Sequence, residues 1–451
     1  MSMKKFIILI LSTLILMNSL VFSASAAFTE SFKTDVEIAY LVSADDESGV
    51  IYDKNSLVRC DPGALVKIVT AILIIENCED LSQSVTASGT AIRSIEHLGI
   101  TTAGILVGET MSVEELLYCL LVYNANDAAN VLAEFLDGTN EKFVERMNGF
   151  AVRLELKDTL FSNPGGYNAE NQYTTARDIA VMFRYCMDNP VFSKIISTFL
   201  YEMPATNKYH ETRYLKNTNY LINSGIWDYY VKSVKGGKSG NTASGNCNVV
   251  SMASKDGYNY ICVVLDAPMQ NLDEDESLEN MSFVTSKKLY EWAFSNIKLR
   301  VVANTSTYAG EVKVRLSDEF DYVSLVPIEN VSALVPSGVS AESVLIEPIS
   351  ELTMEQIDAP VKKGDILGRA AIKYAGETVA EVDLVAAFDV KLSPVKFVFD
   401  KIISVLTSPA FIILFIVVLV VLIPLCVISH RNKRKMRLRK LREQRNKTKR
   451  G

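Results

Sequence analysis

Histidine and cysteine, the residues that form most transition-metal sites, are scarce in this chain of 451 residues. There are three histidines, and no cysteines and histidines stand at the spacing of a zinc site. The seven cysteines form an odd and scattered set, which makes a poor disulfide framework. The sequence therefore predicts neither a metal centre nor a cysteine-stapled scaffold, and we expect no metal and no cofactor.

Basic residues are scarce over most of the chain. Residues 1–430 carry 34 Lys and Arg against 52 Asp and Glu, a net charge of −18. The whole-chain charge of −7 hides this excess, because residues 431–450 contain 12 basic residues and one acid. An acidic body of this kind is not typical of nucleic-acid-binding proteins, so we expect no nucleic-acid partner.

The first 26 residues have the pattern of a secretory signal peptide. Two lysines precede an apolar core, and Ala24-Ser25-Ala26 supplies the small residues of a cleavage site. We expect cleavage after Ala26, with an uncleaved membrane anchor as the alternative. This pattern predicts that the protein acts outside the cytoplasm.

The other end of the chain predicts a membrane anchor. Residues 409–428 are apolar throughout and long enough to cross a bilayer as one transmembrane helix. Residues 429–451 are strongly basic, and a basic segment beside an apolar span marks the cytoplasmic side. We therefore expect a single-pass protein of the cell membrane with its body outside and its tail in the cytoplasm. Because the tail adjoins the span, contact with anionic lipid explains its charge better than a nucleic-acid arm does.

The pattern of expected elements changes once between these ends. Residues 27–296 begin and end with strands and have helices between them, which predicts a mixed α/β (α+β) domain with an antiparallel sheet. Residues 297–392 show short alternating strands and no long helix, which predicts a small all-β domain. Residues 393–408 are then a juxtamembrane linker that contains a short helix.

One lysine stands inside the most apolar predicted helix. Asp61 is a suitable N-cap, Pro62 fits the first helical position, and the run that follows is apolar on nearly every face. The helix should therefore be buried. Lys67 is the one charge in this run, and a buried lysine is costly without partners. Ala64 lies one turn earlier on the same face, where enzymes with the S-x-x-K sequence carry their serine.

Two further motifs follow in order along the chain. A capping box, Ser112 with Glu115, starts a helix that runs into Asn124-Ala125-Asn126, and Lys238-Ser239-Gly240 comes later. With the segment around Lys67, these motifs resemble those of the low-molecular-mass penicillin-binding proteins, the serine-type D-alanyl-D-alanine carboxypeptidases. That family carries S-x-x-K, S-x-N and K-T-G or K-S-G in this order. The resemblance covers residues 30–390, including the C-terminal β-domain.

The resemblance implies a fold and a set of site residues. The fold is the penicillin-binding-protein and β-lactamase-like transpeptidase domain, followed by the small all-β domain. Residue 64 takes the place of the nucleophile and Lys67 that of its general base. Residue 124 takes the place of the serine that relays protons, and Asn126 that of the amide that binds the substrate's peptide carbonyl.

The same resemblance implies a binding edge for the substrate. Lys238 and Ser239 are expected to hold the substrate carboxylate, while Gly240 lets the ligand approach the strand closely. The backbone N–H groups of residue 64 and Asn241 are expected to form the oxyanion hole. The implied substrate is the peptidoglycan stem peptide that ends in D-Ala-D-Ala.

Two of these positions depart from the family pattern. Ala64 replaces the nucleophilic serine and Asn124 replaces the second serine. A methyl group cannot attack a carbonyl, and loss of the nucleophile from a serine protease reduces turnover by roughly 10⁶. Cys60, Thr70 and Thr285 are the candidates for a substitute nucleophile, and none stands where the motif order requires one.

The sequence leaves several functions open. The protein is a pseudoenzyme that binds stem peptide or a wall-synthesis partner, a working carboxypeptidase that removes terminal D-Ala, or a protein–protein scaffold that uses its β-domain. A further interpretation is that the surviving polar side chains are a leftover buried hydrogen-bond network that only holds the helix in place. No protein partner can be named from the residues.

Overall fold

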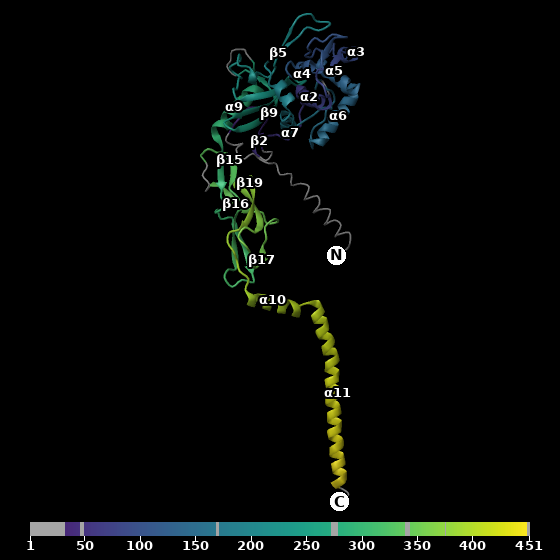
Figure 1. Ribbon diagram of the computed structural model, residues 1–451, viewed down its shortest axis with the longest axis vertical. Coiled ribbons are helices and arrows are strands. Elements are labelled where there is room, and N and C mark those ends of the chain that lie inside the picture. The colour runs from purple at the N-terminus through teal and green to yellow at the C-terminus, as the bar shows by residue number, and fades with distance from the viewer. Residues whose placement is uncertain are drawn as a thin grey trace. The chain divides into compact units, whose positions relative to one another are not determined.

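The computed structural model describes residues 32–45, 49–167, 171–271, 278–338, 343–374 and 376–448 (Figure 1). The predicted signal peptide lies outside these residues. The chain divides into two compact units. The first comprises the chain up to Val302 with Ser332–Leu345 and Ile372–Ala380, and the second comprises Ala303–Val331, Ile346–Ala371 and Glu381–Gly451.

A five-stranded antiparallel sheet forms the centre of the first unit, with strand order β2-β1-β9-β8-β7. Its strands are β1 (Ile38–Ser43), β2 (Val50–Lys54), β7 (Val234–Asn241), β8 (Cys247–Lys255) and β9 (Tyr258–Ala267). Successive side chains of a strand point to opposite faces. Val263 of β9 accordingly joins the hydrophobic core on one face, and Val264 joins the core on the other. Both faces of the sheet are therefore covered.

Helices cover these two faces unequally. The larger core contains α2 and its neighbours, whereas the smaller one contains α9 (Met281–Asn296) packed on β8 and β9. The other helices are α2 (Lys67–Asn77), α3 (Gly89–Arg93), α4 (Val113–Leu121), α5 (Asn126–Asp137), α6 (Asn140–Arg153), α7 (Ala176–Met187) and α8 (Pro190–Ile196). Short elements complete the unit: β3 (Ser84–Thr86) with β4 (Thr110–Ser112), β5 (Leu200–Met203) with β6 (Arg213–Lys216), η3 (Tyr220–Ile222), and β10 (Met269–Gln270) with β11 (Glu279–Asn280).

The predicted capping box at the start of α4 is confirmed. The Ser112 hydroxyl accepts the backbone N–H of Glu115 at 3.1 Å, and the Glu115 carboxylate accepts the N–H of Ser112 at 2.7 Å. Both bonds satisfy donors that the first helical turn leaves without partners. This cap fixes where α4 begins, and α4 leads directly into the loop that contains Asn124.

The expected start of the Lys67 helix needs correction. The Asp61 carboxylate does accept a backbone N–H, that of Gly63 at 2.9 Å, but the first turn is the 3₁₀ helix η2 (Gly63–Val66). The α-helix begins at Lys67. Gly63 has φ +50°, outside the right-handed helical region, so the expected α-helix cannot run back through this residue to Asp61. The burial of the helix is confirmed, since every residue from Lys67 to Ile74 is buried.

The region after α9 consists of strands, as predicted. Strand β12 (Ile297–Ala303) pairs with β15 (Val331–Pro336). A six-stranded sheet has the order β16-β18-β19-β14-β13-β17. Its strands are β13 (Gly310–Arg315), β14 (Tyr322–Pro327), β16 (Leu345–Pro348), β17 (Gln356–Asp358), β18 (Ile366–Tyr374) and β19 (Glu377–Ala386). The described residues between β12 and β19 contain no α-helix.

The chain ends in two helices, α10 (Pro394–Leu406) and α11 (Pro409–Thr448). The segment Pro409–Arg439 is long and apolar enough to cross a membrane, and it is the one such segment in the described part of the chain. Helix α11 continues from this segment into the basic tail without a break. An ion pair of 2.7 Å between Arg315 of β13 and Asp400 of α10 joins the second sheet to the juxtamembrane helix.

Candidate functional site

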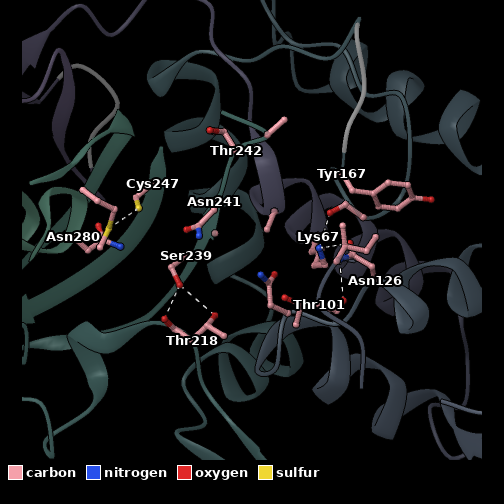
Figure 2. A pocket seen from close by; sticks show the side chains of 18 of the residues that line it. Lys67, Thr101, Asn126, Tyr167, Thr218, Ser239, Asn241, Thr242, Cys247 and Asn280 are labelled. Atoms are coloured by element: carbon pink, nitrogen blue, oxygen red, sulfur yellow. Dashed lines mark hydrogen bonds between the residues drawn. The ribbon is translucent and has the colours of Figure 1, made fainter. Parts of the chain in front are cut away.

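A cleft of about 570 Å³ lies in the first unit, where η2 and the first turn of α2 meet one end of β7 (Figure 2). Seven of the eight predicted site residues line it. They are Ala64, Lys67, Asn124, Asn126, Ser239, Gly240 and Asn241. The eighth, Lys238, is 1% exposed and buried beneath that end of β7. The chain thus brings together residues that lie as far as 177 positions apart in the sequence.

The buried lysine of α2 has two neutral hydrogen-bond partners. The Lys67 ammonium donates to Oδ1 of Asn126 at 2.8 Å and to the carbonyl oxygen of Gly165 at 2.6 Å. Burial lowers the pKa of Lys67 well below its ordinary value, and the nearby charge of Lys238 lowers it further, whereas Asp127 opposes both effects. The hydrogen-bond acceptors of Lys67 are therefore neutral, and its ammonium group loses a proton more readily than that of an exposed lysine.

The first turn of α5 holds one wall of the cleft. Asn126 donates to the carbonyl of Thr101 through both its backbone N–H, at 2.9 Å, and its side-chain amide, at 3.0 Å. The carboxylate of Asp127 accepts the N–H groups of Ala103 and Ile105 at 3.0 and 2.9 Å. Because these bonds fix the loop around Thr101, the side chain that meets Lys67 also holds the adjoining loop of the same wall.

The nucleophile position is tightly enclosed by backbone. A Cβ atom placed on Gly240 of β7 would lie 2.3 Å from the Cβ of Ala64, and one placed on Gly166 would lie 1.9 Å from the carbonyl oxygen of Gly63. Only glycine fits at either site, because real Cβ atoms do not approach other atoms this closely. The two glycines therefore let β7 and the 163–167 loop close around residue 64, which still lines the cleft.

The end of β7 presents polar groups to the cleft opposite Lys67. Figure 2 shows Ser239 and Asn241 on the strand side and Lys67 with Asn126 on the helix side. The Ser239 hydroxyl donates to the carbonyl of Thr218 at 2.8 Å. The Lys238 ammonium donates to the backbone carbonyl of Ser239 at 3.0 Å, and burial lowers the pKa of Lys238 to about 7. In the described part of the chain, the hydrogen-bond acceptors of both lysines are neutral oxygens.

Asn124 occupies the second serine position in an unusual conformation. Its backbone has φ +69°, in the left-handed region where asparagine is tolerated better than most residues. Its side-chain oxygen is buried and has no hydrogen-bond partner. The sequence identified this position as a departure from the family pattern, but it gave no sign of the backbone conformation.

None of the expected substitutes for a nucleophile is placed to act as one. The Thr70 hydroxyl donates to the carbonyl of Pro164 at 2.7 Å, and Thr285 is buried within α9 on the far side of the sheet. Burial raises the pKa of the Cys60 thiol to about 12. A further thiol that sequence reasoning missed, Cys247, lines the cleft, and burial raises its pKa as well. The thiolate is the reactive form, so neither cysteine replaces a serine.

Sequence reasoning also missed an aromatic cluster at one end of the cleft. The rings of Tyr220, Tyr229 and Phe283 lie with centroids 5.4 to 6.2 Å apart, and all three line the cleft. They come from η3, the loop after it and α9. No spacing in the sequence signals that these rings meet, because the contact depends on how α9 packs.

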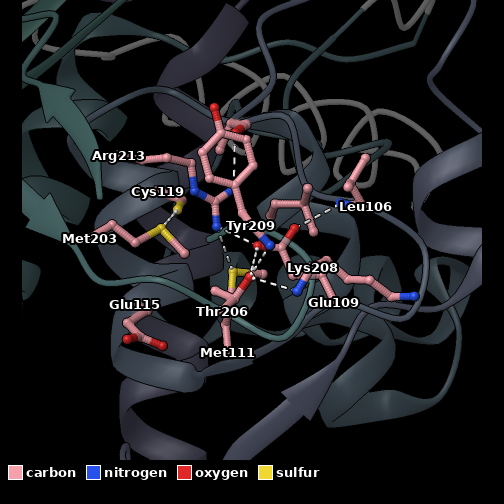
Figure 3. A network of polar contacts seen from close by, with 12 residues as sticks. Leu106, Glu109, Met111, Glu115, Cys119, Met203, Thr206, Lys208, Tyr209 and Arg213 are labelled. Atoms are coloured by element: carbon pink, nitrogen blue, oxygen red, sulfur yellow. Dashed lines mark hydrogen bonds and ion pairs between the residues drawn. The ribbon is translucent and has the colours of Figure 1, made fainter. Parts of the chain in front are cut away.

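A buried ion pair supports the loop that carries Thr101 (Figure 3). The Glu109 carboxylate pairs with the guanidinium of Arg213 on β6, accepts the Thr206 hydroxyl at 2.8 Å and accepts the N–H of Leu106 at 2.9 Å. The Glu109 side chain is fully buried. This pair joins the cleft wall to the β5–β6 hairpin, and the motifs of the sequence did not point to it.

Comparison with known proteins finds matches over both units. The family model described as D-alanyl-D-alanine carboxypeptidase matches residues 26–269, and the model described as penicillin-binding protein 5, C-terminal domain, matches residues 300–392. D-alanyl-D-alanine carboxypeptidase DacF of Bacillus subtilis is 30% identical over 392 residues, which are 85% of this chain and 94% of that protein. DacC of Escherichia coli is 26% identical over 353 residues, covering 76% of this chain and 81% of that protein.

Solved structures show the same similarity. Penicillin binding protein 5 of Haemophilus influenzae has a TM-score of 0.57 and 25% sequence identity, with 80% of this chain and 98% of that chain covered. The D-alanyl-D-alanine carboxypeptidase DacD of Francisella tularensis has a TM-score of 0.64 at 20% identity, covering 80% of this chain and 95% of that chain, and supports the fold alone.

Proposed function

Because the chain belongs to the D-alanyl-D-alanine carboxypeptidase family of low-molecular-mass penicillin-binding proteins, we propose that it is a pseudoenzyme that binds stem peptide without cleaving it. The family acts on peptidoglycan, and the ligand in this proposal is a stem peptide that ends in D-Ala-D-Ala. A wall-synthesis protein that presents a similar terminus would use the same cleft.

The observation that carries this proposal is the methyl group of Ala64. Covalent acyl transfer needs a nucleophilic atom with a lone pair that bonds to the carbonyl carbon while its proton passes to a base, and the amine then departs with a proton. The Cβ of Ala64 has no lone pair to give and no proton that Lys67 could accept. By analogy with serine proteases, the loss amounts to roughly 10⁶ in turnover, or about 8 kcal/mol of barrier.

The rest of the cleft keeps groups that suit an anionic peptide terminus. Lys67 and Lys238 are buried, and their hydrogen bonds go to neutral oxygens. A ligand carboxylate would supply an anionic hydrogen-bond acceptor, which neither lysine has among the described residues, and charge-assisted hydrogen bonds are stronger than neutral ones. Ser239 and Asn241 line the strand side of the cleft, where such a carboxylate would bind.

The proposal also places the protein at the membrane. Helix α11 carries the one described segment that could cross a bilayer, and the basic residues that follow favour a cytoplasmic tail. The cleft would then face the wall outside the membrane. The signal peptide expected at residues 1–26 supports the same orientation.

Labelling with a fluorescent penicillin tests the proposal directly. A β-lactam forms a covalent adduct only with a competent nucleophile, so we expect no stable label on the wild-type protein and a label on Ala64→Ser after denaturing electrophoresis. Ala243→Ser is the matched control, because Ala243 lines the same cleft away from Lys67. A stable label on the wild type would overturn the pseudoenzyme proposal and favour an active carboxypeptidase.

A peptide titration separates a binder from a scaffold. The full-length protein in lipid nanodiscs is titrated with an N-acetylated tripeptide that ends in D-Ala-D-Ala. Saturable binding is expected, and an equal peptide ending in L-Ala-L-Ala is the control for stereochemical selectivity. If the folded protein shows no saturable binding at millimolar peptide, the cleft is not a peptide site and the scaffold function becomes the better interpretation.

A further inference from the structure

Tyr220 of η3 presents an aromatic ring to one end of the cleft. Its ring packs on those of Tyr229 and Phe283, with centroids 6.2 and 5.5 Å away. Phe283 is buried in the smaller hydrophobic core, whereas Tyr229 is half-buried and Tyr220 is 40% exposed. The two tyrosines therefore carry the accessible surface of the cluster, and a ligand in the cleft can reach it.

The fold itself holds this cluster in place. The Tyr229 hydroxyl accepts the backbone N–H of Asn280 at 3.0 Å, and Phe283 belongs to the first turn of α9. Single exposed aromatic residues are common on protein surfaces and need no explanation. Three rings packed on one another at the end of a cleft differ from these, because aromatic side chains that are already fixed bind apolar groups with little loss of conformational freedom.

The cluster adjoins the strand side of the cleft, where the proposed function places the ligand carboxylate. The Ser239 hydroxyl donates to the carbonyl of Thr218 at 2.8 Å, and Thr218 also lines the cleft. Tyr220 follows Thr218 by two residues, so their Cα atoms are at most about 7 Å apart. The last residue of a peptide carries its side chain on the carbon atom next to the terminal carboxylate. The last side chain of the ligand is therefore the one nearest to the cluster.

We infer that the aromatic cluster is a subsite for the side chain of the ligand's last residue, and that it favours an apolar side chain longer than the methyl group of D-alanine. This inference rests on the proposed function. A methyl group extends one bond from the Cα, whereas a leucine side chain extends over three and has more apolar surface to place on the tyrosine rings. Binding strengthens with the apolar area that is removed from water. The favoured ligand is then a stem peptide whose last residue is a D-amino acid with a branched aliphatic side chain.

Three ligands test the inference on the full-length protein in nanodiscs. They are N-acetylated tripeptides that share their first two residues and end in D-Ala, D-Leu or D-Asn. The side chains of leucine and asparagine branch at the same atom and are similar in size, but only that of leucine is apolar. We expect the dissociation constant of the D-Leu peptide to be about tenfold below that of the D-Ala peptide. The D-Asn peptide should bind no more tightly than the D-Ala peptide.

Substitutions at Tyr220 assign the effect to the cluster. Tyr220→Ala should bring the dissociation constants of the D-Leu and D-Ala peptides to within about threefold of each other, because the accessible ring is gone. Tyr220→Phe keeps the ring and should keep the wild-type preference. Tyr214→Ala is the matched control, because Tyr214 is 60% exposed and lies on β6, outside the cleft. This variant should also keep the preference.

The wild type alone already decides the inference. If it binds the D-Leu peptide no more tightly than the D-Ala peptide, the inference is overturned while the proposed function stands. D-Asn and D-Leu peptides of equal affinity would overturn it too, because the gain would not come from apolar surface. A preference of undiminished size in Tyr220→Ala would show that the cluster is not the subsite. If none of the three peptides binds, the proposed function fails and the inference fails with it.

Discussion

Two buried cationic regions of the first unit differ in how their charge is balanced. Arg213 pairs with the buried carboxylate of Glu109, which in turn accepts two further hydrogen bonds. Lys67 and Lys238 are at least as well buried, but their acceptors are neutral oxygens. The first region is complete within the protein, because its cation bonds directly to a carboxylate. The second is incomplete in this sense: neither lysine hydrogen-bonds to a carboxylate among the described residues, and the Asp127 carboxylate, whose charge acts on Lys67, is bonded to backbone N–H groups instead. The pair at Glu109 therefore balances its charge within the fold, whereas the two lysines have the arrangement that the proposed function requires.

The strongest test of this comparison removes the carboxylate from the complete region. Glu109→Ala leaves the Arg213 guanidinium buried without its anion, and breaking a buried pair in this way destabilises a protein by about 3–5 kcal/mol. We expect a correspondingly large drop in the thermal unfolding midpoint of the full-length protein. An unchanged midpoint would show that the buried charge of Arg213 does not need the Glu109 carboxylate for stability. The two regions would then not differ in the way described above.

The second test removes a cation from the incomplete region. Lys67→Met keeps an unbranched side chain and leaves only the neutral acceptors of Asn126 and Gly165 without a donor, at a cost of roughly 1–3 kcal/mol. We expect a smaller shift of the unfolding midpoint than for Glu109→Ala, together with at least a roughly tenfold loss of peptide affinity. If Lys67→Met bound the peptide with wild-type affinity, the Lys67 side chain would not take part in ligand binding.

The third test uses pH. Burial lowers the pKa of Lys238 to about 7 from an ordinary value of 10.5. Between these values the unfolded chain holds the extra proton, so this lysine makes the free energy of unfolding rise with pH over that window. Ligand binding has the opposite sign, because a carboxylate favours the charged lysine and its affinity falls as pH rises through about 7.

The measurement is the dissociation constant of the peptide across this window. From about pH 6 to about pH 8.5 we expect it to rise roughly tenfold. Lys238→Met supplies the control, since the dependence should flatten when the titrating group is gone. A wild-type affinity that does not change with pH would mean that the lysine charge is not used in binding.

The smallest effect is expected at an exposed ion pair. Arg59 and Asp158 are 2.6 Å apart, but their side chains are 53% and 37% exposed. Water screens such a pair, so Asp158→Asn should leave the unfolding midpoint unchanged within error. A large shift of the unfolding midpoint would show that burial does not explain why the charges of the two regions above contribute more to stability than an exposed ion pair does.

The sequence predicted the parts of the site that follow from local motifs. The capping box at Ser112 is present in the structure. The family resemblance placed Lys67 and Asn126 in one site, and the two side chains are hydrogen-bonded. The fold class was also predictable, because the strands β8 and β9 and the helices between β2 and β7 carry clear hydrophobic patterns. The roles of the site residues and the domain boundaries at 296 and 392 stay predictions.

Other features depend on contacts that no local pattern encodes. Glu109 and Arg213 lie 104 positions apart and belong to no motif, so their pairing appears only when the β5–β6 hairpin packs on the cleft wall. The 3₁₀ turn at Gly63 was missed because the capping signals of Asp61 and Pro62 are equally typical of an α-helix. The positive φ of Asn124 likewise follows from how the loop joins α4 to α5.

The glycines around residue 64 have a consequence for the evolutionary history of the protein. Gly240 and Gly166 keep free the space that the backbone near residue 64 requires, although that residue is now alanine. Alanine and serine codons can differ by a single nucleotide, so a nucleophile at this position is one point mutation away. If the protein is the pseudoenzyme proposed above, selection for carboxypeptidase activity or for β-lactam binding would start from a cleft whose enclosing backbone is already in place.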